Sequence, residues 1–134
     1  MTLVNTPALI KDLLKVLPDV LPSVSIDELQ QLPHSSACYL WSKADTVLYV
    51  GLTHNLHWRY NNKNPHKLTQ LRAKGAERLS WITLKNSRSF DEMGDAKIIE
   101  AALIGLLQPP LNIEWNSKYK FLWADRKRPS KRLT

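Results

Sequence analysis

The sequence predicts an α+β domain whose elements follow the order β-β-α-α-β-α. Residues 37–42 and 46–50 are short runs rich in Tyr, Val, Leu and Trp, and only a polar corner around Asp45 separates them. A connection this short predicts an antiparallel hairpin, because a parallel pair of strands needs a long crossover. Residues 91–108 begin with acidic side chains and stop at Pro109, which is typical of a long helix with a positive N-terminal end.

The segment between the hairpin and the long helix predicts two short helices and a third strand. Gly51 closes the second strand and, lacking a side chain, permits a sharp exit into a helix. Thr53 or Asn55 caps that helix, which runs to about Asn62. The remaining elements are a basic helix at about 66–74, which Gly75 ends, and a strand at 79–84.

The region before this core is predicted to be helical, and the region after it is predicted to be a basic tail. Residues 6–17 carry apolar side chains near helical spacing, and Pro18 is expected to end this helix by holding Leu17 out of the helical region. Residues 18–36 then form a connector with a turn or two of helix. The predicted divisions are a helical N-terminal extension at 1–35, a folded domain at 36–115 and a basic tail at 116–134.

Length and composition favour one cytoplasmic domain. A chain of 134 residues fits a single domain with one core. Cys38 is the only cysteine, which excludes an internal disulfide and fits a reducing cytoplasm. No apolar run approaches the ~20 residues that a membrane-spanning helix needs, so we expect neither a secretory signal nor a membrane partner.

The positive charge is concentrated in two segments. Residues 57–88 and 116–134 hold fifteen of the nineteen Lys and Arg residues but only two of the twelve acids. This asymmetry favours a polyanion, with nucleic acid as the first candidate, although a merely solubilising face is the alternative. The candidate nucleic-acid-binding residues are Lys63, Lys67, Arg72, Lys74, Lys127 and Arg128.

Five positions carry the candidate chemistry. They are Tyr39 in the first strand, Tyr49 with Gly51 in the second, Arg59 eight residues later, Glu100 in the long helix and Asn112 beyond it. The set resembles the signature of the GIY-YIG nuclease superfamily, whose two strand motifs appear here as Ala37-Cys38-Tyr39 and Tyr49-Val50-Gly51. The segment KIIEAALIGLLQPPLN is similar to the family's glutamate helix and its Pro-x-x-Asn ending. The resemblance covers about residues 36–113 and is to a small stand-alone member.

This resemblance implies a small three-stranded antiparallel sheet flanked by helices, and a DNA endonuclease that depends on Mg²⁺ or Mn²⁺. Glu100 interrupts an apolar helix stripe, where a carboxylate should pair or bind a metal because burying it alone costs free energy. One glutamate suits a hydrated Mg²⁺ held mainly by waters and substrate oxygens. DNA is the expected partner, and a homodimer or a partner protein is expected to add specificity.

The remaining site residues take roles that phosphodiester cleavage requires. Tyr39 would accept a proton from water, but its usual pKa near 10 demands a nearby cation. The planar guanidinium of Arg59 suits two phosphate oxygens. His66, displaced from the family's usual position, is a candidate proton shuttle, and Lys63 is an alternative phosphate contact. Asn112 would hold the shape of the site.

Each residue also has a simpler structural explanation. Tyrosines in strands are usually core residues, a glutamate can pair with Lys97 one turn away, and Asn112 after two prolines can be a turn residue. Ala37 replaces the family's usual glycine, where a positive φ would be unfavourable. The alternative function is therefore a catalytically weak or inactive nucleic-acid-binding module of the same fold. A basic interaction protein with an accidental resemblance is a third alternative.

Overall fold

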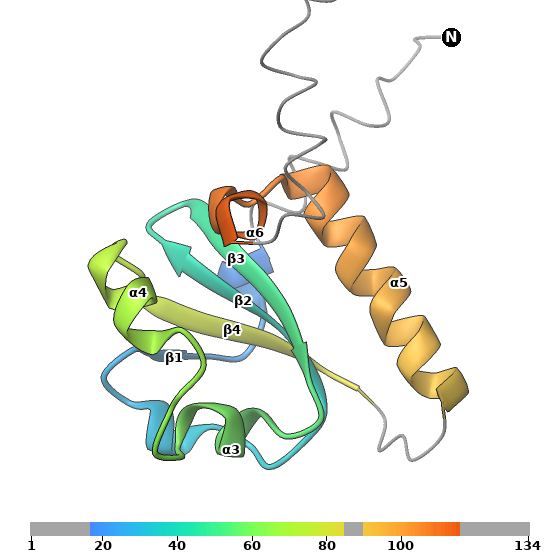
Figure 1. Cartoon of the computed structure of the whole chain (residues 1–134), viewed down its shortest axis with the longest axis horizontal. Helices are drawn as coiled ribbons and strands as arrows, with labels where there is room; N and C mark the ends of the chain where they lie inside the picture. Colours follow the sequence, from blue (N-terminus) through green and yellow to red (C-terminus); the bar gives the residue numbers. More distant parts are fainter. Residues whose placement is uncertain (1–16, 85–89, 116–134) are drawn as a thin grey trace, which may run out of the picture.

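The protein is an α+β domain built on one sheet, as the sequence predicts (Figure 1). The computed structural model describes residues 17–84 and 90–115, with the side chains of 90–95 excepted. In chain order its elements are α2 (Leu17–Val20), β1 (Ser23–Ser25), the 3-10 helix η1 (Leu29–Gln31), β2 (Ala37–Lys43), β3 (Thr46–Thr53), α3 (Leu56–Tyr60), α4 (Leu68–Ala73), β4 (Arg78–Thr83), α5 (Phe90–Leu107) and α6 (Pro110–Trp115).

The sheet has four antiparallel strands in the order β1-β4-β2-β3. The predicted hairpin is confirmed as β2 and β3, and the predicted third strand is β4. The three-strand count was wrong, because β1 adds an edge strand that pairs Val24 with Leu79. Its sequence, Ser-Val-Ser, is too short to show the alternating pattern by which a strand is predicted.

The hairpin strands divide their side chains between two differently built faces. Side chains alternate along a strand, so Tyr39 and Trp41 point to one face while Cys38 and Leu40 point to the other. The first, which we call the aromatic face, belongs to a buried cluster that also contains Tyr60 and Leu71. The second, the aliphatic face, packs with residues of α5 such as Leu103 and Ile104. Figure 1 shows α5 running alongside β3.

Two helices lie close to their predicted positions. The side chain of Asn55 caps α3 by accepting a hydrogen bond from the Trp58 N–H at 3.0 Å, so Asn55 rather than Thr53 is the cap. Helix α3 nevertheless ends at Tyr60 instead of Asn62. Gly75, at φ 86°, follows the end of α4 in the left-handed region that favours glycine.

The prolines after α5 end one helix and begin another. Helix α5 stops at Leu107 as predicted, and Gln108 turns the chain with φ 49°. The sequence did not predict α6, which starts directly at Pro110. Proline suits the first position of a helix, since its missing N–H would have no intrahelical partner there.

At the N-terminal end, the prediction that Pro18 ends a helix was wrong. Leu17 and Pro18 lie within α2, and the Leu21 N–H donates to the Leu17 carbonyl at 2.9 Å. The residue before a proline is disfavoured in helical geometry but not barred from it. The rest of the helix predicted at 6–17 and the basic tail at 116–134 lie outside the described residues. No helix in the described part of the chain is long and apolar enough to cross a membrane.

Candidate functional site

A buried set of aromatic side chains forms the floor of the candidate site. The Trp41 indole N–H donates to the Tyr60 hydroxyl at 3.0 Å, and the Tyr60 ring meets the Tyr39 ring edge-on at 5.6 Å between centroids. Sequence reasoning did not include Tyr60 in the site. Its position four residues after Leu56 was the available signal, because that spacing puts both side chains on the same buried face of α3.

Gly51 makes room for Tyr39, which corrects the predicted role of this glycine. Gly51 lies within β3 directly opposite Tyr39, and the strand continues to Thr53. A Cβ atom at position 51 would collide with the Tyr39 ring and hydroxyl. The glycine therefore serves a close side-chain approach across the hairpin and not an exit from the strand.

The surroundings of Tyr39 do not suit the predicted role as a base. Its side chain is 1% exposed. Burial raises the pKa of Tyr39 well above its usual value, the neighbouring phenols of Tyr60 and Tyr49 raise it further, and Arg59 opposes these effects only weakly. A phenol this buried is not placed to take a proton from water, and it acts instead as packing beneath the more accessible residues.

Tyr49, Arg59 and His66 come together above this floor from three different elements. Tyr49 is half-buried on β3, and its hydroxyl lies 3.5 Å from Nε2 of His66 in the loop before α4. Burial lowers the pKa of His66 to about 4, and the positive charges of Arg59 and Lys67 add to this effect. The imidazole is therefore neutral at pH 7, and a ring nitrogen is available to accept a proton.

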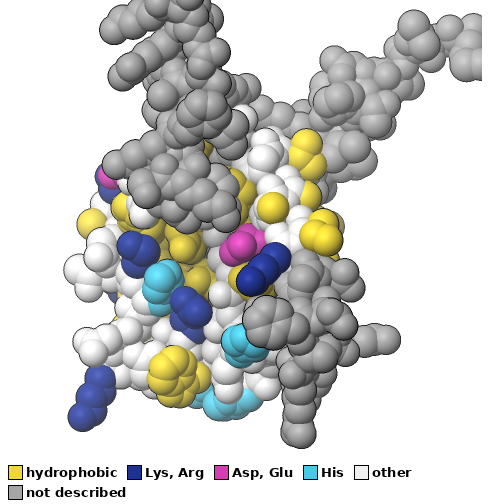
Figure 2. Space-filling model, turned by 45° about the vertical axis from the view of Figure 1, so that its right-hand side comes forward, with side chains coloured by type: hydrophobic (Ala, Val, Ile, Leu, Met, Phe, Trp, Pro, Cys, Tyr) yellow, Lys and Arg dark blue, Asp and Glu magenta, His cyan; other side chains and the backbone are white. Residues whose placement is uncertain are grey.

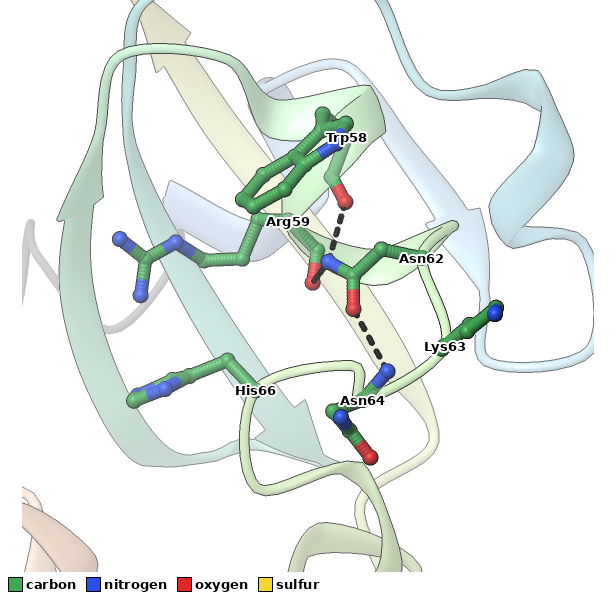
Figure 3. A pocket seen from close by; sticks show the side chains of 6 residues that line it. All are labelled: Trp58, Arg59, Asn62, Lys63, Asn64 and His66. Carbon is green, nitrogen blue, oxygen red and sulfur yellow. Dashed lines mark hydrogen bonds between the residues drawn. The ribbon is translucent and has the colours of Figure 1, made fainter.

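Arg59 and His66 line a cavity of about 530 Å³ whose other walls are Trp58, Asn62, Lys63 and Asn64. Figure 3 shows the Arg59 and His66 side chains extending in the same direction. The loop is tied to α3 through Asn62, whose amide nitrogen donates to the Trp58 carbonyl at 2.7 Å and whose amide oxygen accepts from the Asn64 N–H at 2.7 Å. A basic, partly polar hollow of this kind suits an anionic ligand.

Glu100 is carried by α5, the helix that packs on the aliphatic face, and it is not among the residues that line the cavity. It is half-buried on α5, between residues that pack on the aliphatic face. Burial raises the pKa of the Cys38 thiol to about 12, and the nearby Glu100 carboxylate contributes to that rise. Among the described residues, no group of three or more His, Cys, Asp or Glu side chains could hold a metal ion.

Asn112 fastens α6 to the central hairpin. Its buried side chain accepts a hydrogen bond from the Val50 N–H at 2.7 Å and donates one to the Val50 carbonyl at 2.8 Å. Both outward-facing backbone groups of Val50 are thereby satisfied at the edge of the sheet. This geometry assigns Asn112 a structural role next to the site and not a turn.

Ala37, the departure in the first strand motif, causes no backbone strain. It is buried in β2, where it pairs with Thr53 on one side and Thr83 on the other. The residues with positive φ in the described part of the chain are Ala44, Lys67, Gln108 and Gly75. Position 37 therefore has no need of the conformational freedom of glycine.

The basic residues predicted to bind nucleic acid have different surroundings. Lys63 lines the cavity, and the Lys67 ammonium lies over the Trp115 ring, 5.0 Å from its centroid. Figure 2 shows basic and histidine side chains on one face of the molecule, together with hydrophobic side chains and an acidic one. The Lys67–Trp115 contact therefore places a cation directly against an aromatic ring.

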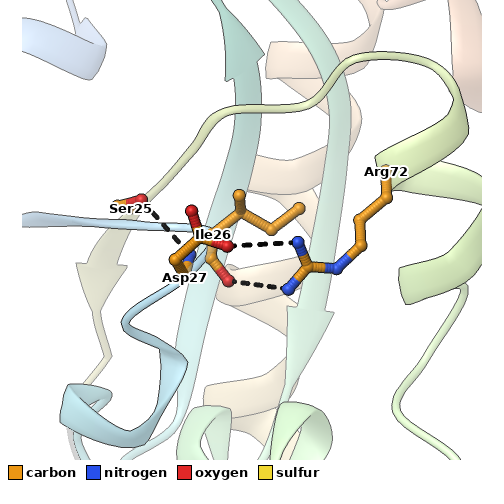
Figure 4. Close-up of polar contacts among 4 residues, drawn as sticks. All are labelled: Ser25, Ile26, Asp27 and Arg72. Carbon is orange, nitrogen blue, oxygen red and sulfur yellow. Dashed lines mark hydrogen bonds and ion pairs between the residues drawn. The ribbon is translucent and has the colours of Figure 1, made fainter.

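Two other basic residues have partners within the protein. Arg72 donates to the Asp27 carboxylate at 3.3 Å and to the Ile26 carbonyl at 3.2 Å, and so connects α4 to the segment after β1 (Figure 4). Lys74 pairs with Glu114 of α6 at 3.3 Å. Both pairs are exposed, so each contributes about 1 kcal/mol or less to stability. Lys127 and Arg128 lie outside the described residues.

Comparison with known proteins gives a distant structural resemblance. No protein-family model matches the chain, and no curated protein matches it either. Among solved structures, the GIY-YIG N-terminal endonuclease domain of UvrC from Thermotoga maritima, bound to its catalytic divalent cation magnesium, is similar with 23% identity and a TM-score of 0.48, covering 63% of this chain and 90% of that domain. A tyrosine-to-phenylalanine point mutant of the same domain is similar with 22% identity, the same TM-score, and coverage of 63% and 89%.

Proposed function

We propose that the protein is a metal-dependent DNA endonuclease that hydrolyses phosphodiester bonds at the cavity beside Arg59. The observation that carries this proposal is that the Arg59 guanidinium and the neutral His66 imidazole line one hollow, while the Tyr49 hydroxyl lies 3.5 Å from Nε2 of His66. Hydrolysis of a phosphodiester needs a proton acceptor for water and a cation for the phosphate, and these residues supply both. The order of motif residues along the chain supports the same function.

The residues divide the work of the reaction between them. Arg59 binds the non-bridging phosphate oxygens through its planar fork and neutralises their charge. The Tyr49 hydroxyl orients the attacking water, and the neutral His66 accepts its proton. The negative charge of a phosphate bound at Arg59 would raise the low pKa of His66 and so make the imidazole a stronger base. Tyr39 packs against the Tyr49 ring and is itself packed by Tyr60, and Asn112 fixes the strand that carries Tyr49.

Glu100 is the residue that would hold the metal ion. A single carboxylate with hard oxygen donors fits a Mg²⁺ or Mn²⁺ ion that keeps most of its waters, and the lack of a three-ligand cluster in the described residues rules against a fully enclosed site there. When bound, the ion would supply charge stabilisation at the phosphate and the leaving oxygen. We place its catalytic role with Glu100 and not with the tyrosines.

Plasmid nicking by the purified protein tests this function. We expect Mg²⁺-dependent conversion of supercoiled to relaxed DNA, which Glu100→Ala abolishes and Arg59→Ala lowers at least about 100-fold, as loss of a transition-state charge contact does. Tyr49→Phe should lower the rate more than Tyr39→Phe, since only Tyr49 is partly exposed. Glu28→Ala and Arg78→Ala are matched controls, because both residues lie outside the cavity lining. Equal nicking by the wild type and Glu100→Ala would show a contaminating nuclease and refute the enzymatic proposal.

A nucleic-acid-binding module without turnover is the second candidate. The burial and raised pKa of Tyr39 favour it, because the first motif tyrosine is not placed to react with water. This candidate predicts that wild type and all variants bind DNA while none cleaves it at any metal concentration. DNA binding measured alongside nicking therefore separates the two functions.

A further inference from the structure

An exposed tryptophan stands at the edge of the cavity. The Trp58 side chain is 65% exposed, although it belongs to a short helix whose residues Leu56 and Tyr60 are buried. Tryptophan is usually buried for most of its area because its large apolar ring gains free energy on leaving water. The proposed chemistry makes no use of this ring, so its exposure calls for a separate explanation.

The backbone of Trp58 is held on both sides. Its N–H donates to the Asn55 side chain at 3.0 Å. Its carbonyl accepts from the Asn62 amide at 2.7 Å and from the Asn61 N–H at 3.3 Å. The indole ring therefore forms part of the cavity wall on a backbone that hydrogen bonds already fix. Little conformational entropy of the backbone is lost when a ligand stacks on the ring.

The other groups around the cavity match a nucleotide. Arg59 and Lys63 supply cations for a phosphate, and Asn64 adds an amide. A hollow of about 530 Å³ lies within the usual range for pockets that bind small groups such as a nucleobase. Aromatic rings beside cations are the common means by which proteins hold unpaired bases, because every base presents a π face.

We propose that Trp58 stacks on an unpaired nucleobase of the DNA while Arg59 and Lys63 hold the adjoining phosphate. A base inside a duplex is already stacked on both sides, so its face is closed to the indole. The substrate class would then be DNA with an unpaired nucleotide next to the scissile bond, as in flaps, gaps and bulges. This inference rests on the proposed function for its substrate, DNA.

Binding without metal provides the test, because it does not depend on cleavage. We would measure fluorescence anisotropy in EDTA with a labelled duplex that carries one bulged nucleotide, and with a fully paired duplex of the same sequence. Trp58→Ala should weaken binding to the bulged DNA about 5- to 100-fold, the range for loss of one base–aromatic stack, and change binding to the paired duplex less than about twofold. Trp58→Phe should keep most of the affinity. Ile98→Ala, at a position that is 68% exposed on α5, is the control for loss of a surface hydrophobic residue and should change nothing.

An abasic nucleotide at the bulge isolates the stacking contact, because it keeps the phosphate and removes the base. The wild type should then bind as weakly as Trp58→Ala does, and Trp58→Ala should be insensitive to the change. An equal loss on bulged, paired and abasic DNA would overturn the inference, and so would displacement of the DNA by micromolar free mononucleotide, which would indicate a nucleotide pocket. If the protein binds bulged DNA through Trp58 but cleaves neither plasmid nor the bulged duplex when Mg²⁺ is present, the proposed function fails and this inference stands.

Discussion

The two faces of the β2–β3 hairpin come from the same strands but are stabilised by different kinds of contact. The aliphatic face consists of side chains such as Leu40 and Val50, which pack against Leu103 of α5. The aromatic face instead packs the Tyr39 and Trp41 rings edge-to-face with Tyr60, and the Trp41 indole N–H donates to the Tyr60 hydroxyl. Apolar packing tolerates small adjustments of shape, whereas a bonded aromatic set fixes the directions of its groups.

This difference shows how a small domain can separate stability from chemistry. The aliphatic face buries apolar area under a long helix, which stabilises the sheet without requiring particular contacts. The aromatic face holds Tyr49, Arg59 and His66 in a defined arrangement at its margin. Changes to the apolar side chains of the first face should mainly alter stability, whereas changes on the second face should alter function in addition. Glu100 is the exception on α5, because it would hold the metal ion.

Loss of the Asn112 side chain should have one of the two largest effects on stability. In Asn112→Ala the buried N–H and carbonyl of Val50 lose their hydrogen-bond partner. Each such group costs about 1–3 kcal/mol, so we expect the free energy of unfolding to fall by about 2–5 kcal/mol. Chemical denaturation measures this directly.

Leu103→Ala is the matched comparison on the aliphatic face, where a cavity should cost about 2–5 kcal/mol as well. The two variants should differ in function: in the temperature range where both are folded, only Asn112→Ala should weaken DNA binding, because it releases the strand that carries Tyr49. Equal DNA binding by both variants would contradict the separation of the two faces.

A methyl group at position 51 should disturb the aromatic face strongly. The added Cβ of Gly51→Ala meets the buried Tyr39 ring, and overpacking of this kind costs about 1–3 kcal/mol. Replacing Tyr39 by the smaller Leu in the same chain should recover part of that loss. A double-mutant cycle monitored by thermal unfolding checks this, and purely additive effects would show that the two positions do not interact.

The titration of His66 should have the smallest effect on stability, and it tests the surroundings of the site residue most directly. Burial lowers the pKa of His66 to about 4, so the folded state disfavours the protonated form relative to the unfolded chain. Stability from this residue is therefore fully present above the ordinary pKa near 6.5 and is lost as pH falls from there toward 4. NMR titration of the imidazole, assigned with His66→Gln, measures the pKa. An inflection near 6.5 would show that the ring is solvated and would remove it as the neutral proton acceptor.

The parts of the fold that local sequence determines were predictable. The short polar corner permits only a hairpin, and Asn55 caps α3 through a side chain three residues from its donor. Strand β1 and helix α6 were not predicted. Each has only a few residues, and each is held by tertiary contacts, β1 with β4 and α6 with β3. Short elements of this kind owe their existence to tertiary contacts, which a local pattern does not contain.

Sequence reasoning nominated residues for the candidate site that the structure places near one another, but it missed Tyr60 and gave Gly51 a different role. The positions of Tyr49, Arg59 and His66 along the chain were sufficient to nominate them. The role of Gly51 depends on the register that sets it opposite Tyr39, and a one-residue shift would have changed it. The lowered pKa of His66 arises mainly from burial, with smaller contributions from Arg59 on α3 and from the adjacent Lys67; of these causes, only Lys67 is visible in the local sequence.

Helix α6 contacts both strand β3 and the loop that leads into α4. Near its start, Asn112 is hydrogen-bonded to the backbone of Val50. At its end, the Trp115 ring contacts both the Tyr49 ring and the Lys67 ammonium. Lys67 holds a left-handed backbone, with φ 54°, as it enters α4. A shift of the loop that carries His66 and Lys67 would alter the Lys67–Trp115 contact, and α6 is hydrogen-bonded through Asn112 to the edge strand β3.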